Sequence, residues 1–375
     1  MIADLIETVV KILIVFGINM GFFAPILGWV ERKQSAVMQD RVGANRADIL
    51  GFRIIGLFHP IADALKVMVK EDFIPDGANK LFHTLAPFIS LTCALVTFAV
   101  IPFGGQYELF GHKVNLVIAD LDVGILFVFA FASLAPFGAV LAGWSSNNNW
   151  SFLGGMRASA QMLSYEVAMG FTIIGVIMVY GTLQLTEIGA AQADFFRWGI
   201  FLQPVGFLLF FTCAIAENKR IPFDMPEAES ELVAGYFTEY SGMKFVMFWM
   251  GEFVEIVTIS AIVTTLFFGA WHIPFVSDTA LVSLFSPVGQ AASNLLAMIH
   301  DSLGSPATAL AVSTLLAMVV NLGVFLAKII FFIWLQMTIR WTLPRFRYDQ
   351  VMRLGWKMIL PISLINIFIT GLFML

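Results

Sequence analysis

Six carboxylates gather in the short stretch 217–239 of a chain that is otherwise strongly apolar. Carboxylates close to one another raise each other's pKa, so such a group can hold and exchange protons near neutral pH. An ordinary solvated loop is the alternative. Residues 227–234 have a helix-forming composition, and Glu227 and Glu231 would then be like charges four residues apart, which destabilises a helix slightly. A stretch that accepts this repulsion favours the proton-holding role. The six are Glu217, Asp224, Glu227, Glu229, Glu231 and Glu239.

Three more carboxylates and one lysine lie inside apolar runs, namely Glu166, Glu252, Glu255 and Lys328. A charged group at membrane depth is costly unless it is paired, hydrated or protonated. Burial also raises a carboxyl pKa, which suits a proton relay. Helix packing or snorkelling is the alternative explanation. The relay is favoured for Glu166 and Glu252, whereas both explanations stay open for Glu255, and Lys328 could be a counter-ion to one of these acids.

Metal chemistry finds little support in the residue pattern. The two cysteines, Cys93 and Cys213, lie apart in apolar runs, and the five histidines show no paired spacing on one helix. Iron–sulfur and zinc sites need grouped ligands. We therefore expect no metal or other cofactor bound by this chain. Two acids in the first eleven residues also argue against a signal peptide, which begins with a basic region.

The composition predicts the element class that must position these charges. Of the 375 residues, 59% are hydrophobic and only 13% are charged, against about 25% charged in a soluble domain. A helix needs about 20 apolar residues to cross the bilayer. We therefore predict an all-α polytopic membrane protein, a single integral-membrane domain over 1–375 with cytoplasmic amphipathic and loop helices. The predicted spans are 9–30, 84–103, 123–144, 158–181, 198–216, 245–270, 307–335 and 358–375.

The distribution of Lys and Arg predicts the orientation. Four inter-span segments hold 17 of the 21 basic residues, and they are 31–80, 145–157, 217–244 and 336–357. Cytoplasmic loops carry the excess of Lys and Arg. These segments, including the acid-rich stretch, are therefore expected in the cytoplasm, with both termini on the outer (periplasmic) side. Their Arg and aromatic residues suit anionic lipid heads or a docking partner, and both remain open.

A more polar segment, 48–70, follows the predicted first span. Its apolar residues recur at a roughly helical spacing, interrupted by charged ones. That pattern predicts an amphipathic helix at the cytoplasmic interface. Pro60 is expected to kink or break this helix. No internal repeat typical of carriers is found.

Several long motifs run along the chain. The first two are Glu31-Arg-Lys-x-x-Ala-x-x-Gln39-x-Arg41-x-Gly43-x-Asn45-Arg46 and Ala62-Asp63-x-x-Lys66 with Lys70-Glu71. The third is Gly155-x-Arg157-x-x-x-Gln161-x-x-Ser164-Tyr165-Glu166. The fourth is Arg220-x-Pro222-Phe223-Asp224 through Pro226-Glu-Ala-Glu-Ser-Glu231 to Glu239-Tyr240-Ser241-Gly242. The last is Arg340-x-Thr342-Leu-Pro344-Arg345-x-Arg347-Tyr348-Asp349-Gln350-x-Met352 with Gly355-Trp356-Lys357. On these motifs the whole chain resembles the H-subunit family of bacterial NADH:quinone oxidoreductase, respiratory complex I.

The resemblance implies a subunit of a proton-pumping translocase in the bacterial cytoplasmic (inner) membrane, with no complete active site on this chain alone. It implies that the subunit forms much of the quinone chamber, with quinone as substrate, and the start of the charged path that couples its reduction to proton translocation. Implied partners are hydrophilic quinone-module subunits on the cytoplasmic side, small membrane subunits laterally, and lipids, but no nucleic acid. FMN and iron–sulfur clusters are expected on partner subunits.

The same resemblance implies roles for individual residues. Those bordering the quinone route would be Glu31, Arg32, Asp63, Phe223 and Arg340. Those of the proton or charge path would be Glu166, Glu217, Asp224, Glu227, Glu229, Glu231, Glu252 and Glu255. No metal ligand is implied.

The chain departs from the family pattern at Ala44, Asn149, Trp150 and Phe253. Phe253 lacks the hydroxyl of the usual Tyr, which puts the details of the proton path there in question. Two other functions compete with the resemblance. One is the anchor subunit of a related membrane-bound hydrogenase, which neighbouring genes would distinguish. The other is a stand-alone proton or cation carrier, which would transport without partners.

Overall fold

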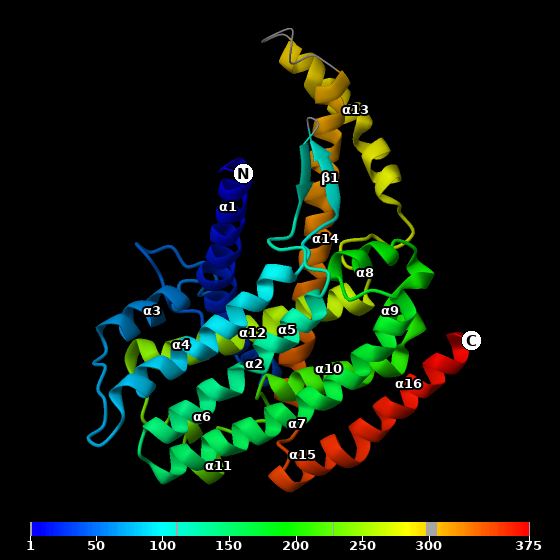
Figure 1. Ribbon diagram of the computed structural model, residues 1–375. Coiled ribbons are helices and arrows are strands. Elements are labelled where there is room, and N and C mark those ends of the chain that lie inside the picture. Colours follow the sequence, from blue (N-terminus) through cyan, green and yellow to red (C-terminus); the bar gives the residue numbers. More distant parts are fainter. Residues whose placement is uncertain (1, 110–111, 228, 298–305, 375) are drawn as a thin grey trace.

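The computed structural model describes residues 2–109, 112–227, 229–297 and 306–374 (Figure 1). Helices provide nearly all the regular structure, as the apolar composition predicts, so the all-α membrane fold class is confirmed. The first eight α-helices are α1 Ile2–Ile18, α2 Ala24–Met38, α3 His59–Val69, α4 Lys80–Val96, α5 Gly124–Ala132, α6 Ala135–Ser145, α7 Asn149–Tyr180 and α8 Leu185–Ala191. The others are α9 Gly199–Leu202, α10 Pro204–Glu217, α11 Glu229–Leu232, α12 Gly242–Phe267, α13 Asp278–Ala297, α14 Pro306–Thr342, α15 Tyr348–Leu354 and α16 Leu360–Met374.

Short turns extend several of these helices. A π-helical turn η1, Asn19–Phe23, joins α1 to α2, and another, η6 Gly355–Ile359, joins α15 to α16. The 3₁₀ turns are η2 Thr97–Val100, η3 Phe195–Arg197 and η4 Gly235–Phe237. Two strands, β1 Gln106–Leu109 and β2 His112–Asn115, pair antiparallel with Gln106 opposite Asn115. This hairpin was not predicted.

Each of the eight predicted spans overlaps a helix or a pair of joined helices. Seven continuous helical stretches of the described residues are long and apolar enough to cross a membrane. The eighth, α10, has only 14 residues, fewer than the roughly 20 that a perpendicular crossing needs. The chain therefore has the make-up of a multi-pass membrane protein, in which α10 lies among longer helices.

The helix α12 forms the centre of the bundle. Eighteen of its residues are buried, and it packs against α4, α10 and α14. Its hydroxyl side chains donate to backbone carbonyls four residues earlier, as Thr258 does to Val254 and Ser260 to Ile256. This satisfies polar groups inside an apolar helix. Because α12 also carries Glu252 and Glu255, the most buried helix holds two of the acids singled out from the sequence.

The predicted helix over 48–70 is only partly correct. The structure has α3 over His59–Val69, while Asp48 to Phe58 form turns and an isolated bridge between Ile49 and Phe52. Pro60 lies in the first turn of α3, where a missing N–H costs no intrahelical hydrogen bond. Pro60 therefore marks the beginning of a helix rather than a kink within one.

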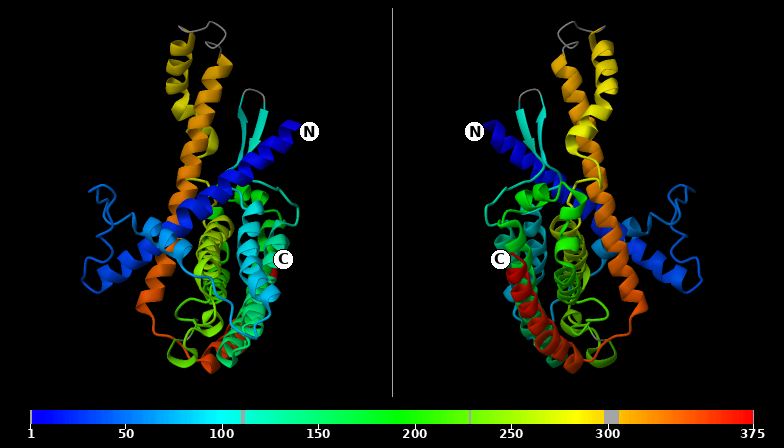
Figure 2. Two further views of the ribbon diagram at one scale, coloured as in Figure 1. Left: turned by 90° about the vertical axis from the view of Figure 1, so that its left-hand side faces the viewer. Right: turned by 90° about the vertical axis from the view of Figure 1, so that its right-hand side faces the viewer.

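The segment 271–306, expected as a loop, contains α13. This helix lies alongside α14, and the two extend away from the rest of the bundle, near the β hairpin (Figures 1 and 2). The helix α14 has 37 residues, longer than one bilayer crossing. Figure 2 shows that α1 also leaves the bundle at an angle, and little of α1 is buried.

Candidate functional site

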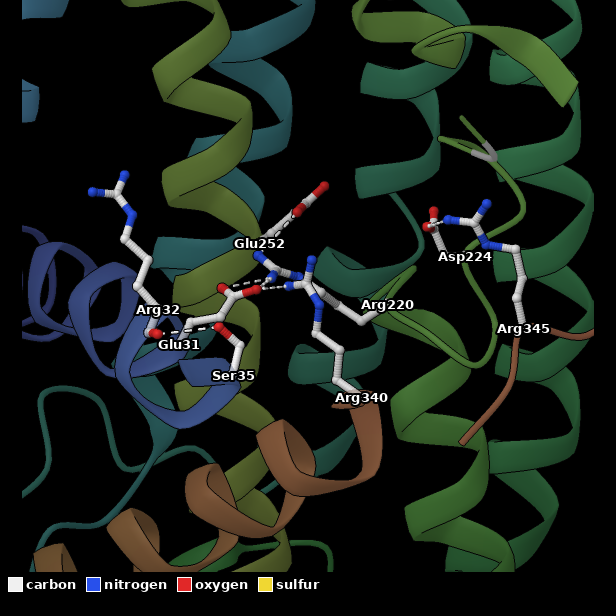
Figure 3. A network of polar contacts seen from close by, with 8 residues as sticks. All are labelled: Glu31, Arg32, Ser35, Arg220, Asp224, Glu252, Arg340 and Arg345. Atoms are coloured by element: carbon white, nitrogen blue, oxygen red, sulfur yellow. Dashed lines mark hydrogen bonds and ion pairs between the residues drawn. The ribbon is translucent and has the colours of Figure 1, made fainter. Parts of the chain in front are cut away.

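The centre of the site is Glu31 on α2, which two arginines contact. Arg220 donates from Nη1 to both carboxylate oxygens of Glu31, at 3.1 and 3.4 Å. Arg340, near the end of α14, pairs with the same carboxylate. Figure 3 shows both guanidinium groups converging on Glu31. Charge-assisted hydrogen bonds are among the strong ones, so the two arginines fix the position of the Glu31 carboxylate.

Arg220 extends this network to α12. Its Nη2 lies 3.2 Å from Oε2 of Glu252, and its guanidinium lies 4.6 Å from the ring centroid of Phe253. Arg220 is 9% exposed and Glu252 is 5% exposed. A pair buried to this extent must be well matched, because each unpaired charge would cost several kcal/mol. Arg220 thus connects α2 and α12 through one side chain. Phe253, the departure noted in the sequence, contributes a ring face to it instead of a hydroxyl.

Lys219, the residue before Arg220, also pairs with a carboxylate on α12, one turn further along that helix. Lys219 is buried, and its Nζ lies 3.8 Å from Oε2 of Glu255. Glu252 and Glu255 are three residues apart, so they share one face of α12. Consecutive cations after α10 therefore pair with two carboxylates on α12.

Two further acids, Glu217 and Glu166, lie near this face of α12. Glu217, at the end of α10, and Glu255 both line a small, mainly apolar cavity of about 60 Å³ that Thr258 and Cys93 also border. Glu166 is half-buried on α7 and lies close enough to Glu217 for their charges to interact. The structure thus places Glu166, Glu217 and Glu255 in one neighbourhood, next to Lys219.

The acid-rich stretch is a compact loop rather than the predicted helix. Its helical part, α11, covers only Glu229–Leu232, so Glu227 and Glu231 do not share a helix face. Gly235 has φ +56°, and a Cβ there would overlap the carbonyl oxygen of Pro226. This close approach folds the stretch back on itself, which prevents a longer helix. The side chain of Glu229 lies outside the described residues.

The loop is fixed by side chains from α7. Gln161 donates from Nε2 to the carbonyls of Ala216 and Phe223, both at 2.6 Å. Arg157 pairs with Glu231 at 2.6 Å, and Asn148 donates to Glu239 at 2.7 Å. The ends and the middle of the acid-rich loop are therefore attached to one helix.

Asp224 and Glu227 are the loop acids nearest the central network. Arg345 donates from Nη2 to Oδ2 of Asp224 at 2.6 Å. Burial raises the pKa of Asp224, and Arg345 offsets part of this rise. Burial, followed by the charges of Glu252 and Asp224, raises the pKa of Glu227 well above its ordinary value. This environment therefore favours the protonated form of Glu227 over its carboxylate.

The residues expected beside the quinone lie in three places, and two of them, Glu31 and Arg340, belong to the central network. Arg32 and Asp63 pair at 2.7 Å between α2 and α3. They border a cavity of about 470 Å³, whose walls include Trp29, Met243 and Trp249. Phe223 is instead buried in the main core, 5.6 Å in centroid distance from both Tyr165 and Phe346. In the structure its neighbours are other core aromatics.

Lys328 does not pair with any of the acids considered as partners. Its Nζ donates to the backbone carbonyls of Phe268, Ala270 and His272 at 2.7–2.9 Å and lies 4.6 Å from the ring centroid of Trp198. The suggestion that it is a counter-ion to an intramembrane acid is therefore wrong. These carbonyls belong to the C-cap and the turn that follow α12, which ends at Phe267, so they take no part in its intrahelical hydrogen bonds.

Four cations of the site were not selected as site residues from the sequence, unlike Arg32 and Arg340. Arg220, Lys219, Arg345 and Arg157 each pair with one or more of the acids that were. The signal that could have found them is simple. Each carboxylate buried in an apolar chain needs a cation, and Lys219 and Arg220 lie within the acid-rich stretch, just after Glu217.

The fold and these buried pairs define a polytopic, all-α membrane protein with charged groups inside its helix bundle. A family model described as NADH dehydrogenase matches residues 10–371. The chain belongs to this family, which confirms the resemblance that the motifs indicated.

Similar proteins from several bacteria are subunits of NADH-quinone oxidoreductase. The H subunit of NADH-quinone oxidoreductase from Flavobacterium psychrophilum is 41% identical over 373 residues, covering 100% of this chain and 98% of that protein. An H subunit of the Geobacter sulfurreducens enzyme, numbered H 1, is 42% identical over 378 residues, covering 98% and 94%. Subunit 8 of the Rhodothermus marinus enzyme is 43% identical over 352 residues, covering 93% and 92%. The similarity therefore extends along the whole chain.

Proposed function

We propose that this chain is the membrane subunit of a proton-pumping NADH:quinone oxidoreductase that forms much of the quinone chamber and the start of the charged path. Family membership and the full-length similarity to H subunits of this enzyme support the proposal. A stand-alone carrier would need no partners, and the full-length similarity to named subunits of a complex makes that alternative less favourable.

The cavity between α2, α3 and α12 suits the tail of a quinone. Its volume of about 470 Å³ lies in the usual range for ligand sites, and its lining is mostly apolar. The Arg32–Asp63 pair at its border supplies polar atoms for the head group as it passes. We propose that quinone enters here with its isoprenoid tail against Trp29, Met243 and Trp249.

One observation carries the proposal. Glu31 and Arg32 are consecutive on α2, and successive residues of a helix point about 100° apart. Arg32 turns toward the cavity and Asp63, while Glu31 turns toward Arg220 and Arg340 (Figure 3). Arg32, at the cavity, is therefore adjacent in the sequence to Glu31, in the buried network. A change of charge in the cavity would occur close to that network.

The network can pass such a change inward. Reducing a quinone to a quinol takes two electrons and two protons, so the charge beside the chamber changes with each turnover. A change near Glu31 alters the field on Arg220, and Arg220 contacts Glu252. We propose that Glu31, Arg220 and Glu252 form the first link. Lys219, Glu255, Glu217 and Glu166 would continue it, with Asp224, Glu227 and Glu231 as its loop side.

The setting of the subunit follows the same proposal. The basic segments and the acid-rich loop would face the cytoplasm and contact hydrophilic subunits, which would carry FMN and the iron–sulfur clusters. Small membrane subunits and lipids would cover its sides. The membrane would be the bacterial cytoplasmic membrane, with both termini outside.

The deciding experiment is Glu252→Gln in the intact complex. We expect NADH:quinone turnover and proton pumping to fall about tenfold or more, the usual scale for a lost proton-transfer group. Reduction of an artificial water-soluble acceptor by NADH should not change. Glu7→Gln, which removes the half-exposed carboxylate of the Glu7–Lys11 pair, is the matched control. Wild-type turnover and pumping in Glu252→Gln would remove Glu252 from the path.

A further inference from the structure

A second large cavity opens at the other end of the bundle from the Glu31 network. It has a volume of about 740 Å³ and lies among β1, α8, the segment after α12, the start of α13 and the middle of α14. These elements lie close together beside the hairpin (Figure 1). The cavity lies beyond the last turn of α12. Lys244, which pairs with Asp72, lies in the first turn of that helix, at its opposite end.

The lining of the cavity is mostly apolar, and its carboxylate groups make it acidic. Asp120, Glu187 and Asp278 line it, together with the amides of Gln106 and Gln184, and the described lining contains no Lys or Arg. Clefts lined by charge of one sign raise the local concentration of the opposite ion. This cavity should therefore attract cations and repel anions.

A histidine forms its inner end. His272 is 4% exposed, and its Nδ1 lies 3.5 Å from Oδ1 of Asp278. Its Nε2 is buried with no hydrogen-bond partner among the described residues, and it belongs to the lining. Asn321 on α14 holds Asp278 in place, donating to Oδ1 at 3.1 Å and to the hydroxyl of Tyr107 at 2.9 Å. One ring nitrogen thus faces a fixed carboxylate, while the other is buried without a hydrogen-bond partner among the described residues, in a residue that lines the cavity.

A carboxylate and an amine both contact this residue. Asp278 faces Nδ1 of the ring, and its pKa is lowered: burial raises it, but the hydrogen bond and charge of His272 and the hydrogen bond from Asn321 lower it overall. Lys328 contacts the backbone instead, because its Nζ donates to the carbonyl oxygen of His272 at 2.7 Å.

We propose that this cavity is an aqueous vestibule selective for cations, in which His272, paired with Asp278, exchanges protons with the water phase on that face of the membrane. In one direction hydronium gives its proton to Nε2 and leaves as water. In the other, the imidazolium returns that proton to a water molecule. The proposal does not depend on where quinone binds, since no residue of the quinone cavity takes part.

Cysteine labelling of the intact complex tests the vestibule. Ala317 lies deep in the lining on α14, and Ala311, equally buried on the same helix, does not line the cavity. We expect Ala317→Cys to react with membrane-impermeant thiosulfonates from that face only, with the cationic reagent about tenfold faster than the anionic one. Asp120→Asn with Glu187→Gln should reduce this preference.

Ala311→Cys should stay unreactive, as should the buried native Cys93 and Cys213. Thr279→Cys, at the cavity edge, replaces Ala317→Cys if that variant fails to assemble. Equal rates with the two reagents, or no reaction at either position, would overturn the proposal.

The pH dependence of the ratio of the two labelling rates, cationic over anionic reagent, tests the role of His272. Thiol ionisation affects both reagents equally, so the cationic-to-anionic ratio reports the charge of the cavity alone. In the Ala317→Cys background we expect the ratio to fall severalfold as pH decreases from about 8 to 5, where histidine titrates. His272→Gln should abolish the fall.

A fall that persists in His272→Gln would overturn the assignment, as would a ratio that responds to sodium instead of pH. Because labelling needs no turnover, this test fails or succeeds independently of Glu252→Gln.

Discussion

Arg345 and Asp224 are 121 residues apart in the sequence, and a 2.6 Å hydrogen bond joins them. The pair attaches the segment between α14 and α15 to the acid-rich loop. The backbone N–H of Phe346 adds a bond to the carbonyl of Pro222 at 3.1 Å. These contacts make the last basic segment part of the site rather than a separate surface.

Removing Arg345 should destabilise the loop more than removing both partners. Arg345→Met leaves the buried Asp224 carboxylate unpaired, which costs about 3–5 kcal/mol, whereas replacing both charges is far milder. We expect a lower thermal midpoint and reduced turnover for Arg345→Met, and substantial recovery of both in Arg345→Met/Asp224→Asn. Arg347→Met is the control, because Arg347 is 80% exposed beside Asp349. No recovery in the double variant would mean that the pair is not coupled.

The stability of the protein should depend on pH through Glu227. Its pKa is raised in the folded state, so the folded state binds more protons than the unfolded state above the ordinary pKa of 4.5. This contribution is complete below that value and is lost as pH rises through the raised pKa. Thermal midpoints should therefore fall less toward alkaline pH in Glu227→Gln than in the wild type. Identical slopes in the two proteins would show that Glu227 keeps an ordinary pKa.

Replacing Arg220 by lysine should reduce quinone turnover. A lysine ammonium cannot reach two carboxylates as a planar guanidinium does, so Arg220→Lys would release Glu31 or Glu252. We expect quinone turnover to drop about tenfold or more in an assembled complex. Arg53→Lys is the matched control, since Arg53 is exposed and only 3.8 Å from Asp48. Full activity of Arg220→Lys would contradict a bridging role.

Narrowing the cavity beside α3 should distinguish quinones by tail length. Val67 lines this cavity, and Val69, two residues later on α3, is exposed and does not. We expect Val67→Trp to raise KM for a long-tailed quinone about tenfold, from an overpacking cost of about 1–3 kcal/mol. A short-tailed analogue should change less, and Val69→Trp should change neither. An equal effect on both quinones would indicate a general distortion of α3.

Much of the architecture could be predicted because apolar runs of membrane length define helices almost by themselves. The position of Glu252 inside the helix bundle was also predictable, since the residue lies within an apolar run. The pairings were not. Arg220 contacts Glu31, 189 residues away, and no local pattern specifies which distant carboxylate a cation meets. The helix predicted after Pro226 failed for a related reason, because packing at Gly235 outweighs helix propensity.

The hairpin, α13 and the role of Lys328 were missed for another reason. Backbone carbonyls that follow a helix end cannot be recognised from the side-chain sequence, yet three of them bind the ammonium group of Lys328. His272 likewise looks like one of five scattered histidines until the fold brings Asp278 and Asn321 beside it.

The central cluster has a formal charge of zero, with two carboxylates, Glu31 and Glu252, and two guanidinium groups, Arg220 and Arg340. Neither arginine can give up its proton in a protein. Any proton that enters therefore leaves the cluster with one unbalanced positive charge in a medium that screens poorly. Under the proposed function, such a cluster would transmit a change of charge at Glu31 through Arg220 to Glu252.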